Sequence, residues 1–148
     1  NVDAKGAEAT PRLMTLIRKA GAEHRVLLAS TGEEGRADRL GYGGPTSATR
    51  RQIRLFFYLH RLPWGGPYTP RTDALQVPFG WEGRQVTTPR MIREAHRRNL
   101  PVHVWTVDDP DIMRTLLRWG VDGIQTDRPD LLPRVKFLQV SHVFQMDL

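Results

Sequence analysis

The chain of 148 residues has a formal net charge of +6 and no cysteine, which suits one domain and excludes disulfides, thiolate metal ligands and a cysteine nucleophile. Its hydrophobic content of 39% argues against wholesale disorder, and no apolar run approaches the roughly 18 residues of a transmembrane helix. The basic residues, mostly arginine, are scattered rather than gathered in a stripe, which argues against a nucleic-acid-binding domain.

The N-terminal part predicts two strands around one helix. Residues 1–5 (NVDAK) predict a short strand, and Thr10 followed by Pro11 is typical of a helix start. Apolar residues then recur at helical spacing up to Gly21 and predict one buried face, made of Leu13, Leu16, Ile17 and Ala20. Residues 25–30 (RVLLAS) form a short apolar run, as a buried parallel strand requires.

The middle of the chain is less regular. Residues 31–46 are rich in glycine and charge and predict a loop, with room for a short strand at residues 45–47. Residues 47–62 predict a helix with Ile53, Phe56 and Phe57 on one face. Residues 62–71 (LPWGGPYTPR) predict another loop.

Regular structure is expected again from residue 74. Residues 74–77 predict a strand that ends at Pro78. Thr88 before Pro89 predicts the next helix start, and Asn99 can close that helix.

The remaining elements follow the same alternation. Residues 101–107 (PVHVWTV) predict a strand, and a helix is expected from Asp109 to Gly120. Residues 123–126 predict a last strand, and residues 131–148 have no clear period. Alternating strands and helices predict an α/β fold with parallel strands and right-handed crossovers. Since a complete eight-stranded α/β barrel takes at least about 200 residues, the chain can supply only about five or six strands of eight.

Ligands of parallel α/β folds bind beyond the carboxyl ends of the strands. The side chains expected there are Asp3, Lys5, Ser30, Gln76, Trp105, Thr126 and Asp127. Carboxylates can hold a divalent cation, lysine can hold a phosphate oxygen, and tryptophan can cover a small polyol. Structural explanations stay open for several: solvated surface charges for Asp3 and Lys5, core packing for Trp105, a turn cap for Asp127, and helix caps for Asp108 and Asp109.

The five histidines offer no metal-ligand spacing and no evident nucleophile. Residues His24, His60 and His96 lie in or beside predicted helices and are expected at the surface, whereas His103 can be buried and His142 lies in the irregular tail. No nucleophile elbow, P-loop or dinucleotide-binding fingerprint is present.

Two segments carry a specific resemblance. Residues 102–109 (VHVWTVDD) and 120–130 (GVDGIQTDRPD) resemble the last two strands of the glycerophosphodiester phosphodiesterases, V-x-V-W-T-V-N and G-V-D-G-I-x-T-D-x-P, with Asp108 where asparagine is usual. Residues 1–5 are similar to that family's N-I-E-I-K strand, and the strands at 26–30 and 74–78 also fit. The resemblance covers residues 1–132 and leaves residues 133–148 as a tail.

The resemblance implies a TIM barrel that hydrolyses glycerophosphodiesters to an alcohol and glycerol 3-phosphate. The family uses a divalent cation, Mg²⁺ or Ca²⁺, held by acidic residues, and two histidines as general acid and base. By position, Asp3 would replace the metal-binding glutamate, Lys5 would lie near the substrate phosphate, and Trp105 would pack against the glycerol end. Two further residues, Ser30 and Gln76, would line the site.

The family's His-Arg-Gly, Glu-x-Asp and His-Asp motifs precede the strand at which this sequence starts. We therefore expect an incomplete TIM barrel, about the last five or six strands of eight, that lacks the catalytic histidines and is inactive alone. Such a chain is either a fragment of a full enzyme or a half-barrel whose open edge is covered by a partner or by its own tail. Open strand edges would permit self-association, and the absence of cysteine and of a signal pattern is consistent with the cytoplasm. A non-catalytic phosphate-binding or interaction module is the alternative.

Overall fold

The computed structural model describes residues 1–30, 32–62 and 66–135. Its contacts group the chain into two compact units, Asn1–Leu75 and Gln76–Leu148. Strands and helices alternate through both, as the sequence predicts for an α/β fold. Within the described ranges, no helix has the length and apolarity needed to cross a membrane.

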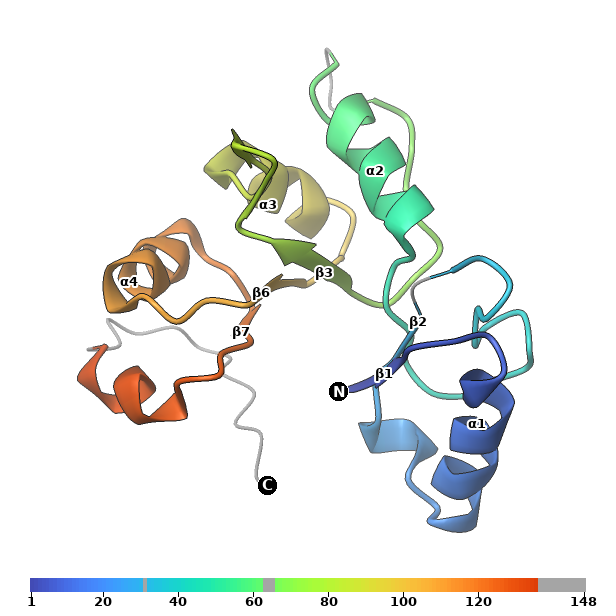
Figure 1. The fold of residues 1–148 in the computed structure, drawn as a ribbon. Helices are drawn as coiled ribbons and strands as arrows, with labels where there is room; N and C mark the ends of the chain where they lie inside the picture. The colour runs from blue at the N-terminus through green and yellow to red at the C-terminus, as the bar shows by residue number, and fades with distance from the viewer. Residues whose placement is uncertain (31, 63–65, 136–148) are drawn as a thin grey trace. The chain divides into compact units, whose positions relative to one another are not determined.

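The described residues of the first unit form two paired strands and two α-helices: β1 (Val2–Ala4), α1 (Ala9–Lys19), a 3-10 turn (Glu23–Arg25), β2 (Leu28–Ser30) and α2 (Arg50–Leu59). Strand β1 lies beside β2 and pairs with it in parallel, so that Ala4 is opposite Ser30 (Figure 1). Two isolated parallel bridges, Leu28 with Thr46 and Ser47 with Ala74, extend the pairing. The short strand expected at residues 45–47 is therefore reduced to single bridges.

Helix α1 buries only part of the predicted stripe. Ile17 is buried and Leu13 packs partly against the core as expected, but Leu16 is 63% exposed and Ala20 is exposed, while Thr10 and Met14 are buried instead. Thr10 does not cap the helix; it lies inside the first turn and its hydroxyl donates to the Gly35 carbonyl. Because that hydrogen bond satisfies the hydroxyl, threonine can enter the core and the helix turns its 10/14/17 stripe inward.

Helix α2 starts at a capping box in which Thr49 and Gln52 satisfy each other's backbone N–H groups. It ends at Leu59, three residues before the predicted end, and Phe56 is fully buried. His60 is only 2% exposed, so its predicted surface position is wrong. The ring stacks on Phe56, and its Nδ1 lies 3.0 Å from the Phe56 carbonyl, which makes burial of the imidazole tolerable.

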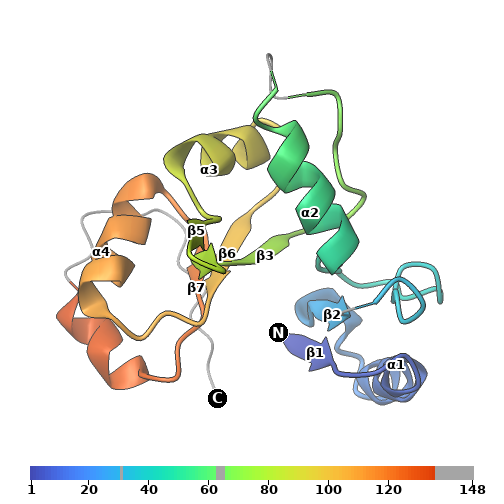
Figure 2. The same ribbon diagram turned by 45° about the horizontal axis from the view of Figure 1, so that its top comes forward.

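Up to Val135, where its described part ends, the second unit has one sheet, in the order β3-β6-β7, and a separate hairpin (Figure 2). Its elements are β3 (Leu75–Pro78), β4 (Gly80–Trp81), β5 (Arg84–Gln85), α3 (Pro89–His96), β6 (Val102–Trp105), α4 (Pro110–Trp119), β7 (Gly123–Ile124) and a 3-10 turn (Pro129–Arg134). Strands β6 and β7 are parallel. The sequence did not predict the β4–β5 hairpin, which turns through Glu82 and Gly83 with positive φ at both.

Helix boundaries in the second unit follow the predicted signals. The Thr88 hydroxyl accepts from the Met91 N–H at the start of α3. The Asp109 carboxylate accepts from the N–H groups of Asp111 and Ile112 at the start of α4. Gly120 and Asn99 both adopt left-handed conformations after their helices. The proposed tail is described only up to Val135; residues 136–148, including His142, lie outside the described residues.

Candidate functional site

The first candidate residues lie at the carboxyl end of β1. Lys5 Nζ is 2.5 Å from Asp3 Oδ2, and the lysine side chain is 84% exposed. An exposed ion pair of this kind contributes little to stability. The ammonium group of Lys5 can therefore exchange this partner for an anion at small energetic cost.

A pocket of about 370 Å³ lies beside the carboxyl ends of β1 and β2. Its lining consists of Ala4, Gly6, Ala7, Ser30, Gly32, Glu33, Glu34 and Gly35. Of the predicted site residues, Ser30 belongs to this lining, while Asp3 and Lys5 do not. The sequence missed Glu33 and Glu34 because they lie in a segment without periodicity.

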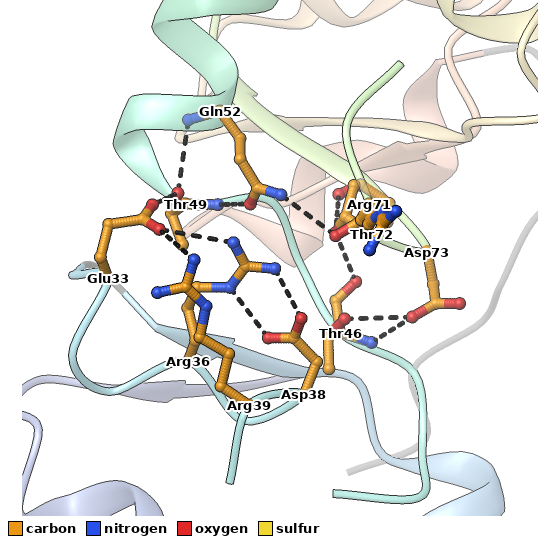
Figure 3. A network of polar contacts seen from close by, with 11 residues as sticks. Glu33, Arg36, Asp38, Arg39, Thr46, Thr49, Gln52, Arg71, Thr72 and Asp73 are labelled. Carbon is orange, nitrogen blue, oxygen red and sulfur yellow. Dashed lines mark hydrogen bonds and ion pairs between the residues drawn. The ribbon is translucent and has the colours of Figure 1, made fainter. Parts of the chain in front are cut away.

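Glu33 is held by several polar contacts (Figure 3). The Thr49 hydroxyl donates to its carboxylate, and guanidinium nitrogens of Arg36 and Arg39 lie 3.4 and 3.8 Å away. The hydrogen bond from Thr49, aided by Arg36, holds the pKa of the Glu33 carboxyl below its usual value although burial opposes this effect. Glu33 is thus a carboxylate at neutral pH whose charge is already balanced inside the protein.

The same polar network continues to the segment before β3. Gln52 Nε2 donates to the Arg71 carbonyl at 3.1 Å, and the Thr72 hydroxyl donates to the Thr46 carbonyl at 2.9 Å. Asp73 accepts from the backbone N–H of Thr46 at 2.8 Å (Figure 3). These contacts fix the connection between β2 and α2. The same connection supplies Gly32, Glu33, Glu34 and Gly35 to the lining of the pocket.

In the second unit, Gln76 lies on β3 and Trp105 ends β6. Gln76 is 7% exposed, yet its amide nitrogen has no hydrogen-bond partner among the described residues. Trp105 is 37% exposed, so the alternative of a core tryptophan does not hold for this unit. His103, between two buried valines of β6, is half-buried.

The loops after β6 and β7 are joined by Asp108. Its carboxylate accepts from the Thr126 hydroxyl at 2.8 Å and from the Asp127 backbone N–H at 2.9 Å. The prediction that Asp108 caps a helix is therefore wrong, because Asp109 alone takes that place. Asp127 does not cap the turn that follows in the way the structural explanation for it required. The hydroxyl of Thr126 accepts from the Arg128 N–H there instead.

A cation site is not complete within the described residues, which contain no cluster of three histidine, aspartate or glutamate side chains suited to a metal ion. Asp3 offers one carboxylate, and one of its oxygens already binds Lys5. Because Mg²⁺ and Ca²⁺ take six or more oxygen ligands in total, Asp3 alone does not suffice for either ion.

Comparison with known proteins points to the same family as the sequence resemblance. The profile of the Glycerophosphoryl diester phosphodiesterase family matches residues 11–131. A Mycobacterium tuberculosis protein named "Probable glycerophosphodiester phosphodiesterase 2" is 37% identical over 144 residues, which cover 89% of this chain and 52% of the relative. The chain thus spans about half the length of that relative.

Solved structures share the fold. A glycerophosphodiester phosphodiesterase from Thermotoga maritima matches with a TM-score of 0.65 and 20% identity, covering 92% of this chain and 57% of its own. The enzyme from Agrobacterium tumefaciens matches with a TM-score of 0.60 and 19% identity, covering 85% of this chain and 51% of its own.

Proposed function

Because the chain belongs to the glycerophosphoryl diester phosphodiesterase family, we propose that it forms the later part of that family's TIM barrel, about the last five or six strands of eight. Residues 1–132 are assigned to the barrel and residues 133–148 to a tail. The observation that carries the proposal is the parallel pairing of β1 with β2, which brings Lys5 and Ser30 to the same strand ends, beside a pocket.

Each candidate residue has a proposed role in binding a glycerophosphodiester. Lys5 binds a phosphate oxygen through its exposed ammonium group, and Trp105 packs against the carbon atoms of the glycerol. Ser30 and Gln76 line the site with a hydroxyl and an amide. Asp3 contributes one carboxylate to a site for Mg²⁺ or Ca²⁺, whose other ligands are not among the described residues.

Hydrolysis to an alcohol and glycerol 3-phosphate further requires groups that move protons. The 148 residues contain no His-Arg-Gly sequence, and general acids and bases contribute typically about 10²–10⁴-fold each. The proposed activity therefore belongs to the whole domain of the family, and these residues supply binding rather than proton transfer.

A non-catalytic phosphate-binding module is the second candidate, supported by the lack of an acidic cluster among the described residues. Either function is compatible with self-association. In the described sheets β1 pairs only with β2 and β7 only with β6, so one edge of each of these strands is open to pairing with a second copy of the chain.

Lys5 provides the test of phosphate binding. Calorimetric titration of the 148 residues with glycerol 3-phosphate, in the presence of a chelator, is expected to show saturable binding that Lys5→Ala weakens about tenfold or more, because a charge-assisted hydrogen bond is lost. Lys19→Ala, which removes an exposed lysine at the end of α1, serves as the matched control and should leave the affinity unchanged. Equal weakening by both variants, or no binding by the wild-type chain, contradicts the assignment.

A further inference from the structure

Helix α2 turns a basic and partly apolar face toward solvent. Its buried side is formed by Gln52 and Phe56, and His60, one turn further along, is also buried. Because residues three or four positions apart share one face of a helix, the exposed residues between these three form the opposite face. This outer face of α2 consists of Arg50, Arg51, Arg54, Leu55 and Tyr58.

The outer face of α2 carries positive charge that no carboxylate in the described part of the chain balances. Arg50, Arg51 and Arg54 form no ion pair with a described residue, whereas Arg18 and Arg36 of the same unit are each paired with a carboxylate. The sequence contains no Asp or Glu from residue 39 to residue 72. Helical spacing therefore gathers these arginines into a local positive field.

The arginines at the start of α2 do not stabilise the helix. Arg50 and Arg51 lie in its first turn, where the helix dipole disfavours positive charge. The capping box of Thr49 and Gln52 already satisfies backbone N–H groups at this end. A binding role on the solvent side accounts for positive charge at positions where it is unfavourable for folding.

Apolar side chains lie among these cations. Leu55 is 41% and Tyr58 is 57% exposed, and Leu62, four positions after Tyr58, is 46% exposed. A tyrosine ring with its polar hydroxyl suits the headgroup level of a bilayer, and a leucine side chain gains free energy when it enters the boundary of the acyl chains. Binding to a nucleic-acid backbone is driven by charge and offers leucine no comparable gain, so the mixture favours a lipid surface.

We propose that the outer face of α2 binds the surface of anionic phospholipid bilayers. The guanidinium groups of Arg50, Arg51 and Arg54 pair with lipid phosphates, which match the arginine fork. Leu55 and Tyr58 insert between the headgroups, so that electrostatic attraction and apolar burial act together. This binding uses residues of the first unit only and is independent of the proposed hydrolysis.

Flotation of the 148 residues with lipid vesicles tests the proposal. Vesicles of phosphatidylglycerol mixed with phosphatidylcholine should bind the chain, and vesicles of phosphatidylcholine alone should bind it at least about tenfold more weakly. Since each basic residue near an anionic surface contributes about fivefold to affinity, the triple variant Arg50→Gln, Arg51→Gln and Arg54→Gln should lose about 100-fold. Added salt should weaken binding of the wild-type chain by screening the same charges.

Two further variants separate a specific face from general attraction. The double variant Leu55→Gln and Tyr58→Gln leaves the charge unchanged and should weaken binding about tenfold, because it removes the inserted side chains. The matched control, Arg12→Gln with Arg25→Gln and Arg84→Gln, removes the same charge from exposed positions outside α2. It should change the affinity by no more than about twofold, since distant charges are screened.

Several results would overturn the proposal. These are wild-type chain that ignores anionic vesicles, equal losses for the two triple variants, and full binding by the Leu55→Gln and Tyr58→Gln variant. Binding of duplex DNA through the same three arginines, without binding of vesicles, would identify a nucleic-acid surface instead. Thermal unfolding checks each variant, and a marked loss of stability on removal of the α2 arginines would contradict a role in binding alone.

Discussion

The purified 148 residues are expected to hydrolyse glycerophosphocholine no faster than buffer alone. Their described histidines are not placed as a catalytic pair: His24 is exposed in a 3-10 turn, His60 is buried against Phe56, His96 binds Asp122, and His103 is half-buried on β6. None of these four lines the pocket at the ends of β1 and β2. Because each missing acid or base typically costs about 10²–10⁴-fold, the loss should be complete within detection.

Release of glycerol 3-phosphate, measured in Mg²⁺ and in Ca²⁺, checks this result. The Thermotoga maritima glycerophosphodiester phosphodiesterase serves as the positive control for the assay. Hydrolysis above the buffer rate that disappears in Asp3→Ala would contradict the expectation, since it would show a working site within these residues.

Asp122→Ala is expected to lower the free energy of unfolding by about 2 kcal/mol, because a backbone N–H loses its partner. Asp122 Oδ2 accepts from the Val102 N–H at 2.7 Å and from His96 Nε2 at 2.8 Å. These bonds tie the start of β6 and the end of α3 to the turn before β7. Val102 is fully buried, so water cannot readily replace the carboxylate.

Urea denaturation of the purified chain measures the effect. Asp122→Asn, which keeps an acceptor for the Val102 N–H, should lose less stability than Asp122→Ala. Asp127→Ala, at an exposed aspartate nearby, should change the free energy by no more than about 0.5 kcal/mol. Equal losses for Asp122→Ala and Asp127→Ala would refute the proposed role of the Asp122 hydrogen bonds.

The sequence predicted the elements whose signals are local. Thr88 and Asp109 cap their helices as expected, since a cap needs only a side-chain oxygen two or three residues before the N–H it binds. Gly120 ends α4 for an equally local reason, because glycine readily adopts the left-handed conformation found there. The family resemblance came from the segments around these same positions and is confirmed by the profile match.

Features that depend on distant partners were missed. The burial of Thr10 depends on the Gly35 carbonyl, which is 25 residues away. Asp108 was interpreted as a helix cap because its contact with Thr126 lies 18 residues along the chain. The pocket wall at Glu33 is fixed by Thr49 across a loop with no periodic pattern. Propensity and spacing carry no information about such contacts.

We propose that these residues complete a phosphodiesterase site together with the earlier part of the family's barrel. The most direct measurement joins the 148 residues to the part of the Mycobacterium tuberculosis relative that precedes its matched region, and follows glycerophosphocholine hydrolysis. We expect hydrolysis that Lys5→Ala reduces about 100-fold or more, through loss of charge stabilisation at the phosphate, while Lys19→Ala has no effect. A folded fusion without hydrolysis, or one whose hydrolysis is indifferent to Lys5, would contradict it.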